Sequence, residues 1–177
     1  MTGVPLPTAA DRRIAWLAAL AVAIHLLEAG FPSPLPGIKP GLANVVTVAS
    51  LLLFGWRTAA WVGLLRVLAG SLLLGTFLSP TFFLSLGGAG GSLLAMGLPA
   101  LLPRHWTGPL GYSVLGALGH MGAQFGIAYA LFIPHPGLLR LLPPFLAAAL
   151  LFGLLGGIIA HAMLQFLDGT DHVRAAR

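Results

Sequence analysis

Long apolar stretches, separated by short turns rich in proline, glycine and arginine, make up most of this chain of 177 residues. The stretches lack the strict alternation of apolar and polar positions that is typical of half-buried or barrel strands. Several extend over about 20 residues, the length at which an α-helix crosses a bilayer. The pattern predicts six transmembrane helices, over 14–29, 42–54, 58–78, 81–102, 109–133 and 143–167.

The second of these stretches is unusually short. Residues 42–54 would form a helix of only about 20 Å, against a hydrocarbon core of about 30 Å. A single lipid-facing helix of this length would not cross upright. Two interpretations remain open: the helix extends into the preceding proline-rich loop, or its neighbours shield it from lipid.

Charged side chains are scarce along the whole chain. Hydrophobic residues make up 58% of the sequence and charged residues 7%, and the mean hydropathy is +0.95. An ordinary soluble domain carries about 25% charged residues. This composition requires lipid as the solvent, so we predict an all-α integral membrane protein with six transmembrane helices in one bundle. The lack of cysteine excludes disulfides, thiol catalysis and zinc–thiolate sites.

Basic residues near the helix ends predict the orientation, because lysine and arginine are enriched in cytoplasmic loops. They stand singly, which indicates topology rather than nucleic-acid binding. We predict a multi-pass protein of the bacterial inner membrane, with a cytoplasmic segment 1–13, a transmembrane domain 14–167 and a polar, frayed cytoplasmic tail 168–177. The cytoplasmic side would hold Arg12, Arg13, Arg57, Arg104, Arg174 and Arg177, and the outer side Lys39 and Arg140.

Arg66 is the one charged residue in the middle of an apolar stretch, 59–78. A guanidinium stays ionised, so at that depth it needs a partner, an aqueous cavity or an anionic ligand. We therefore predict that Arg66 points into the bundle. Glu28 lies near the outer end of its own helix, whereas Arg66 is about 12 Å from the inner end of its helix, so a direct pair requires tilted helices. Freed carbonyls near 87–91, the Gln124 amide or a bound anion are the expected partners.

Other polar groups fall within the predicted helices. His120 and Gln124 are four residues apart, so they share one helix face. Glu28 either reaches the outer interface or pairs with Lys39 across the first loop. A lone histidine in a helix is usually packed and hydrogen-bonded, and no local spacing supplies the ligands of a metal site, so we expect neither metal nor cofactor.

Two clusters of small residues are open to two interpretations each. The glycines at 87, 88, 90 and 91 cost helix propensity, and indicate either a broken helix that lines a ligand cavity or close helix packing. Ala15, Ala19 and Ala23 form a stripe on the first helix, which allows close approach of either another helix of this chain or a partner protein.

A set of positions in the first half of the chain carries a resemblance to a known family. They are Gly37, Lys39, Gly41, Leu42, Ala43, Asn44, Gly55, Arg66, Gly75, Ser85, Gly87 and Gly88. Segment 31–96, and more loosely all six predicted helices, resembles the membrane family known both as heptaprenyl diphosphate synthase component I and as the Gx transporter family. Pro40 departs from the leucine expected there, which concerns the loop more than the family.

That family in turn is similar to the substrate-binding (S) subunits of energy-coupling factor transporters. The resemblance implies a six-helix protein that captures a small solute from outside the cell. It also implies docking on a shared transmembrane coupling subunit, which works with ATPases, through an alanine stripe in the first helix. Ala15, Ala19 and Ala23 match that stripe.

The name of the family implies an enzyme, but the residues do not support one. Prenyl chain elongation uses aspartate-rich motifs that hold magnesium against diphosphate. The aspartates of this chain, Asp11, Asp168 and Asp171, all lie in the terminal segments. The chain cannot assemble that site alone, and at most it is a non-catalytic membrane partner of a synthase.

The leading interpretation is therefore a substrate-binding or transport protein for a small polar or anionic solute. The alternatives are a non-catalytic membrane component of polyprenyl diphosphate synthesis and an assembly subunit of a membrane redox complex, in which Arg66 would be structural. The predicted ligand-binding residues are Lys39, Asn44, Arg66, Ser85, Gly87, Gly88, His120 and Gln124.

Overall fold

The computed structural model describes residues 6–30, 41–98 and 108–175, and all of the regular structure in them is helical. The prediction of an all-α fold is confirmed. Lys39 and the proline-rich loop lie outside the described residues. The helices are α1 (Ala9–Gly30), α2 (Leu42–Phe54), α3 (Trp56–Leu73), α4 (Pro80–Gly97), α5 (Pro109–Ile127), a π-helical turn (Ala128–Phe132), α6 (Pro136–Leu139) and α7 (Leu142–Ala175).

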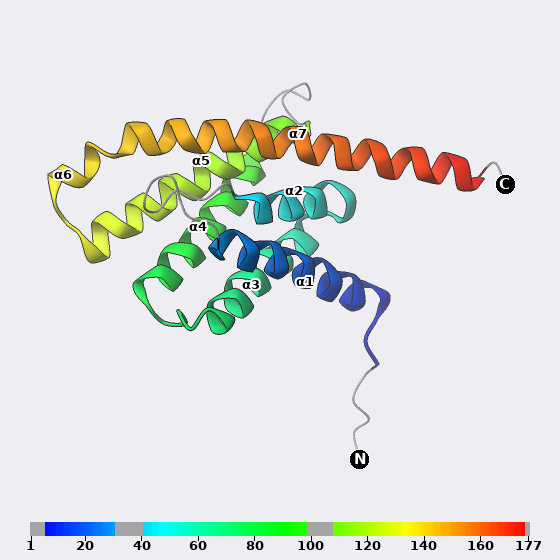
Figure 1. Cartoon of the computed structure of the whole chain (residues 1–177), viewed down its shortest axis with the longest axis horizontal. Helices are drawn as coiled ribbons and strands as arrows, with labels where there is room; N and C mark the ends of the chain where they lie inside the picture. The colour runs from blue at the N-terminus through cyan, green and yellow to red at the C-terminus, as the bar shows by residue number, and fades with distance from the viewer. Residues whose placement is uncertain (1–5, 31–40, 99–107, 176–177) are drawn as a thin grey trace, which may run out of the picture.

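The helices form two groups that meet at α2 (Figure 1). On one side α1 packs against α3. On the other side α5 packs between α4 and α7. The short helix α2 touches α1, α3, α5 and α7, and most of its residues are buried. Of the two interpretations of 42–54, shielding by neighbours is confirmed, since α2 begins at Leu42, immediately after Gly41 in a left-handed conformation.

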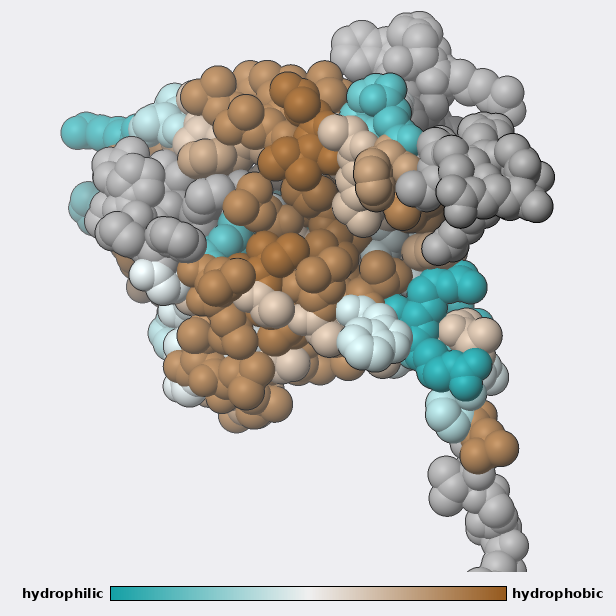
Figure 2. All heavy atoms as spheres, turned by 45° about the vertical axis from the view of Figure 1, so that its right-hand side comes forward, coloured by the Kyte–Doolittle hydropathy of each residue, from teal (hydrophilic) through white to brown (hydrophobic). Residues whose placement is uncertain are grey.

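Three helical segments of the described chain are long and apolar enough to cross a membrane. They are Ala9–Gly30, Pro109–Phe132 and Pro136–Leu167. Large apolar side chains cover their outer faces: Trp16 is 78% exposed, and an apolar surface extends over the face in Figure 2. An apolar surface of this extent requires lipid or a partner protein. The count of six spans and the cytoplasmic termini stay predictions.

The boundaries of several helices differ from those predicted, and α1 begins at Ala9 rather than at 14. Helix α3 ends at Leu73, although the apolar stretch continues to 78, because the chain turns at Gly75 with φ of +67°. Ser79 then caps α4, and Pro80 occupies its first position, where a missing N–H costs nothing. The expectation of a frayed tail is wrong for 168–175, since α7 continues as a helix to Ala175. Extending an existing helix by one residue is far easier than nucleating one.

Candidate functional site

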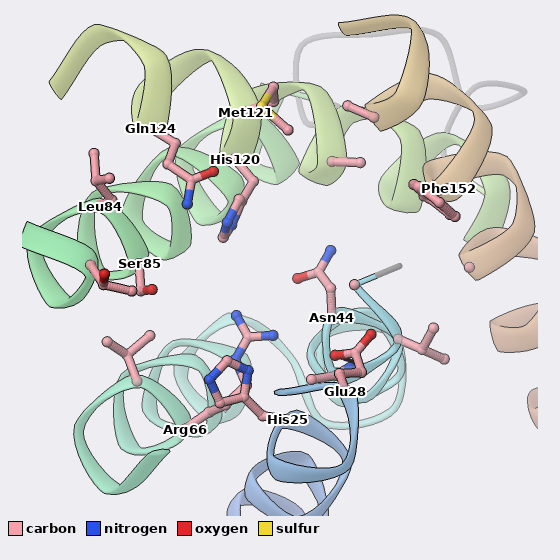
Figure 3. A pocket seen from close by; sticks show the side chains of 18 of the residues that line it. His25, Glu28, Asn44, Arg66, Leu84, Ser85, His120, Met121, Gln124 and Phe152 are labelled. Carbon is pink, nitrogen blue, oxygen red and sulfur yellow. Dashed lines mark hydrogen bonds between the residues drawn. The ribbon is translucent and has the colours of Figure 1, made fainter. Parts of the chain in front are cut away.

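A cavity of about 410 Å³ lies where the two groups of helices face each other. Its volume is within the range of small-molecule pockets. Helices α1, α2 and α3 supply one wall, and α4, α5 and α7 the other (Figure 3). Polar side chains from five helices converge on it, and they are His25, Glu28, Asn44, Arg66, Ser71, Thr81, Ser85, Ser113, His120 and Gln124.

Arg66 is the centre of this arrangement. It is buried, with 7% of its surface exposed, and its guanidinium points from α3 into the cavity (Figure 3). Within the described part of the chain Arg66 makes no hydrogen bond or ion pair, and Glu28 is the acidic group that acts on it electrostatically. The prediction that Arg66 points into the bundle beside a polar cavity is confirmed. The carbonyls of 87–91 are not its partners.

Glu28 has a structural partner of its own, the N-terminus of α2. Its Oε1 accepts a hydrogen bond from the Leu42 N–H at 2.6 Å, and its Oε2 accepts one from the Ala43 N–H at 3.4 Å. These N–H groups are among those that a helix leaves unpaired at its start. The residue is only 6% exposed, so the expectation that it reaches the outer interface is wrong. The carboxylate fastens α1 to α2 at the rim of the cavity.

Asn44 lies in the first turn of α2, and its amide points into the cavity (Figure 3). Its Oδ1 is buried and has no hydrogen-bond partner among the described residues. A buried polar atom without a partner costs about 1–3 kcal/mol. Such a cost at a cavity wall is offset when a ligand or a water molecule supplies the missing donor.

His120, Gln124 and Ser85 face the cavity from the opposite wall (Figure 3). His120 and Gln124 do share one face of α5, as their spacing predicts. The imidazole of His120 is hydrogen-bonded to the backbone of Gly88. A Cβ atom at Gly88 would lie 2.6 Å from the ring, so only glycine leaves room for it.

The glycine cluster in α4 packs the helix against α5. Helix α4 is continuous, so the interpretation as a broken helix is wrong. Gly87 faces the Ile127 side chain, and a Cβ at Gly91 would lie 2.5 Å from the Gly119 carbonyl oxygen. Gly87 and Gly88 do not line the cavity, although both were predicted as ligand-binding residues. Gly87 and Gly88 leave room for the Ile127 and His120 side chains of α5, and Gly91 lets the two helix backbones approach closely.

Several cavity residues were not among the predicted ligand-binding set. His25 and Glu28 carried a signal, since they lie three residues apart and so share one face of α1. His25 packs against α3 at Gly70, where a Cβ would lie 2.8 Å from its ring. Ser71 and Ser113 gave no such signal, because an isolated serine in an apolar helix does not reveal which neighbour it meets.

The alanine stripe of α1 lies on the outside of the molecule. Ala15, Ala19 and Ala23 are all exposed, whereas Ala18 and Ala21 on the other face are buried. Of the two interpretations, packing within this chain is therefore wrong for the stripe. The exposed small side chains leave a shallow surface on which another helix could lie.

These side chains can bind one anionic group of a ligand and form several hydrogen bonds to the uncharged remainder of that ligand. The guanidinium supplies the positive charge, the amides and hydroxyls supply hydrogen bonds, and Phe82, Met121 and Phe152 supply apolar contact. An aspartate-rich motif, which would hold magnesium against a diphosphate, does not occur in the sequence.

Comparison with known proteins gives one result. No curated protein and no solved structure matches this chain. The family model described as heptaprenyl diphosphate synthase component I matches residues 17–163. The matched region runs from the middle of α1 to the second half of α7 and so contains every described residue of the cavity. With helices long enough to cross a membrane, a buried arginine at the cavity and this match over most of its length, the chain belongs to the heptaprenyl diphosphate synthase component I family.

Proposed function

We propose that this protein binds a small anionic or strongly polar solute within the membrane, as the substrate-binding subunit of a transport system. The observation that carries the proposal is Arg66, a buried cation that no described residue pairs and that faces a cavity. Leaving such a group without an anion is costly in apolar surroundings. A bound solute supplies that anion.

The route of the solute follows from the predicted topology. With both termini in the cytoplasm, the rim of the cavity at Glu28 lies in the outer half of the bundle. The protein would sit in the bacterial inner membrane as a multi-pass protein and take its solute from outside. Lys39 stays a predicted further positive group in the loop that precedes α2.

The exposed stripe of Ala15, Ala19 and Ala23 supports the proposed partner. A transmembrane coupling subunit linked to ATPases would lay a helix along it. The energy for release of the solute would then come from the partner, since the residues of this chain offer no nucleotide-binding motif.

The test is native mass spectrometry of the protein purified in a mild detergent. We expect the wild-type protein to carry a retained small molecule. Ser85→Leu places a larger side chain in the cavity and should remove the adduct. Ala147→Leu adds similar bulk on an exposed position of α7 and should keep it. An adduct that survives Ser85→Leu unchanged would exclude the cavity as the binding site.

The family name supports a second candidate function, that of a membrane component associated with polyprenyl diphosphate synthesis. In this role the chain would be non-catalytic and would hold a soluble synthase at the membrane. Co-purification separates the two functions. Recovery of a soluble prenyl synthase favours the second function, and recovery of an ATPase-containing coupling module favours the first.

A further inference from the structure

The charges around the cavity restrict the kind of anion that it can hold. Of the described lining side chains, Arg66 carries a permanent positive charge and Glu28 a negative charge. Glu28 is already bound to the N-terminus of α2 through both carboxylate oxygens. The partial positive charge of a helix N-terminus, about half a unit, favours a carboxylate in that position. Among the described residues, Arg66 is therefore the charge that a ligand would balance.

One carboxylate balances Arg66 one for one. A guanidinium presents two parallel N–H groups that match the two oxygens of a carboxylate. A phosphate monoester carries about −1.5 to −2 charge at neutral pH, and a diphosphate carries more. The extra negative charge would meet Glu28 in the same cavity, in surroundings that solvate it poorly. The opposite charges of Arg66 and Glu28 thus favour a singly charged acid over phosphorylated compounds.

The other residues that line the cavity indicate the chemistry of the rest of the ligand. The buried Oδ1 of Asn44 has no donor among the described residues, so a ligand N–H or O–H would satisfy it. Gln124 offers further hydrogen bonds from α5. Phe82, Met121 and Phe152 present apolar surface to the same space. The volume of about 410 Å³ suits a compact molecule.

We infer that the cavity binds a small organic monocarboxylic acid, with its carboxylate on Arg66, a hydrogen-bond donor on Asn44 and a partly apolar body against α4, α5 and α7. This inference rests on the proposed function and specifies its solute. The inferred ligand differs from the prenyl diphosphates that the family name suggests, because it carries a single negative charge.

The experiment is mass spectrometry of the compounds extracted from the purified full-length protein. Methyl esterification of the extract identifies a carboxylate, since each one adds the mass of one methylene. We expect the retained wild-type compound to gain one such increment, to lack phosphorus and to carry a hydroxyl or N–H group. A phosphorylated compound, a compound with several carboxylates, or a plain fatty acid from the lipid, which has no second donor, would overturn the inference. Each of these results would still leave solute binding itself supported.

Variants of Arg66 test the position of the carboxylate. Arg66→Met should lower the retained amount about 30-fold or more, because truncating one side of a buried charged pair removes most of the affinity. Arg66→Lys keeps the positive charge but loses the two parallel N–H groups, so retention should fall by a smaller factor. This variant also provides the test if Arg66→Met does not fold. Arg57→Met removes an exposed arginine from the same helix and is the matched control.

The two proposals fail in different ways. If a folded Arg66→Met or Arg66→Lys variant retains the acid as well as the wild type, Arg66 does not hold the carboxylate and the inference is wrong. If the wild-type protein retains nothing, or if Ser85→Leu has no effect on what it retains, the proposed function fails and the inference fails with it.

Discussion

Removing the carboxylate of Glu28 should loosen the junction between α1 and α2. In Glu28→Ala the N–H groups of Leu42 and Ala43 lose their acceptor, and the place is part-buried at Leu42 and buried at Ala43. The short bond of 2.6 Å to a charged acceptor is worth about 1.5–3 kcal/mol, and the longer bond of 3.4 Å adds less. Loss of a negative charge at a helix N-terminus adds up to about 1 kcal/mol. The total is about 2–4 kcal/mol, equivalent to a fall in Tm of about 4–16 °C for a chain of this size.

The assay is thermal unfolding of the protein in detergent, followed by intrinsic tryptophan fluorescence. Glu28→Gln keeps one acceptor oxygen but loses the charge, so its Tm should fall between those of the wild type and Glu28→Ala. Asp11→Ala is the matched control, because Asp11 also accepts backbone and side-chain hydrogen bonds near a helix start, from Thr8, but is exposed. Its effect should be the smaller one. If Glu28→Ala unfolds at the same temperature as Asp11→Ala, the carboxylate does not hold α2 as described.

Further variants test the packing, the outer surface and the orientation. Gly91→Ala should lower the Tm, because its Cβ would meet the Gly119 backbone. Gly90→Ala is the control and should keep or raise the Tm, because there is open space around Gly90. Equal effects of the two variants on the Tm would contradict the packing argument. Ala19→Trp should leave the retained solute unchanged but prevent co-purification of a partner, and recovery of that partner would rule out docking on the stripe. A single cysteine replacing Leu139 should react with a membrane-impermeant reagent added outside the cell, and one replacing Trp56 should not; the reverse labelling would refute the predicted topology.

Helix α2 shows where the sequence was informative about the fold. Its predicted range, 42–54, is the observed one, because Gly41 and Gly55 flank an apolar stretch and both adopt positive φ. The end of α3 at Leu73 was not predicted, although Gly75 also adopts a positive φ. The residues around Gly75, such as Leu74, Phe77 and Leu78, are apolar, so the stretch resembles a continuing helix. In an apolar chain, hydropathy locates helices but does not tell a helix end from an apolar turn.

The candidate site was predictable in part for a related reason. Arg66 had to face a polar space, since the cost of a buried charge does not depend on knowing its neighbours. The convergence of Asn44, Ser85, His120 and Gln124 on that space is a property of the packed bundle. The hydrogen bonds of Glu28 join residues 14 and 15 positions away in the sequence. Contacts of this kind depend on how helices pack, which the spacing within one helix does not reveal.

The glycine contacts of α5 have a mechanical consequence. Gly91 of α4 meets the backbone at Gly119, and on the other side Cβ atoms at Gly153 and Gly157 of α7 would come within 3.0 and 2.8 Å of the Cα atoms of Val114 and Leu110. Helices whose backbones are in such close contact cannot slide past each other easily, so α4, α5 and α7 should move as one rigid unit. The opposite wall, α1 with α2 and α3, is joined within itself by the hydrogen bonds of Glu28, and it meets the other helices through α2 and α3. We expect solute to enter and leave when this wall moves relative to α4, α5 and α7.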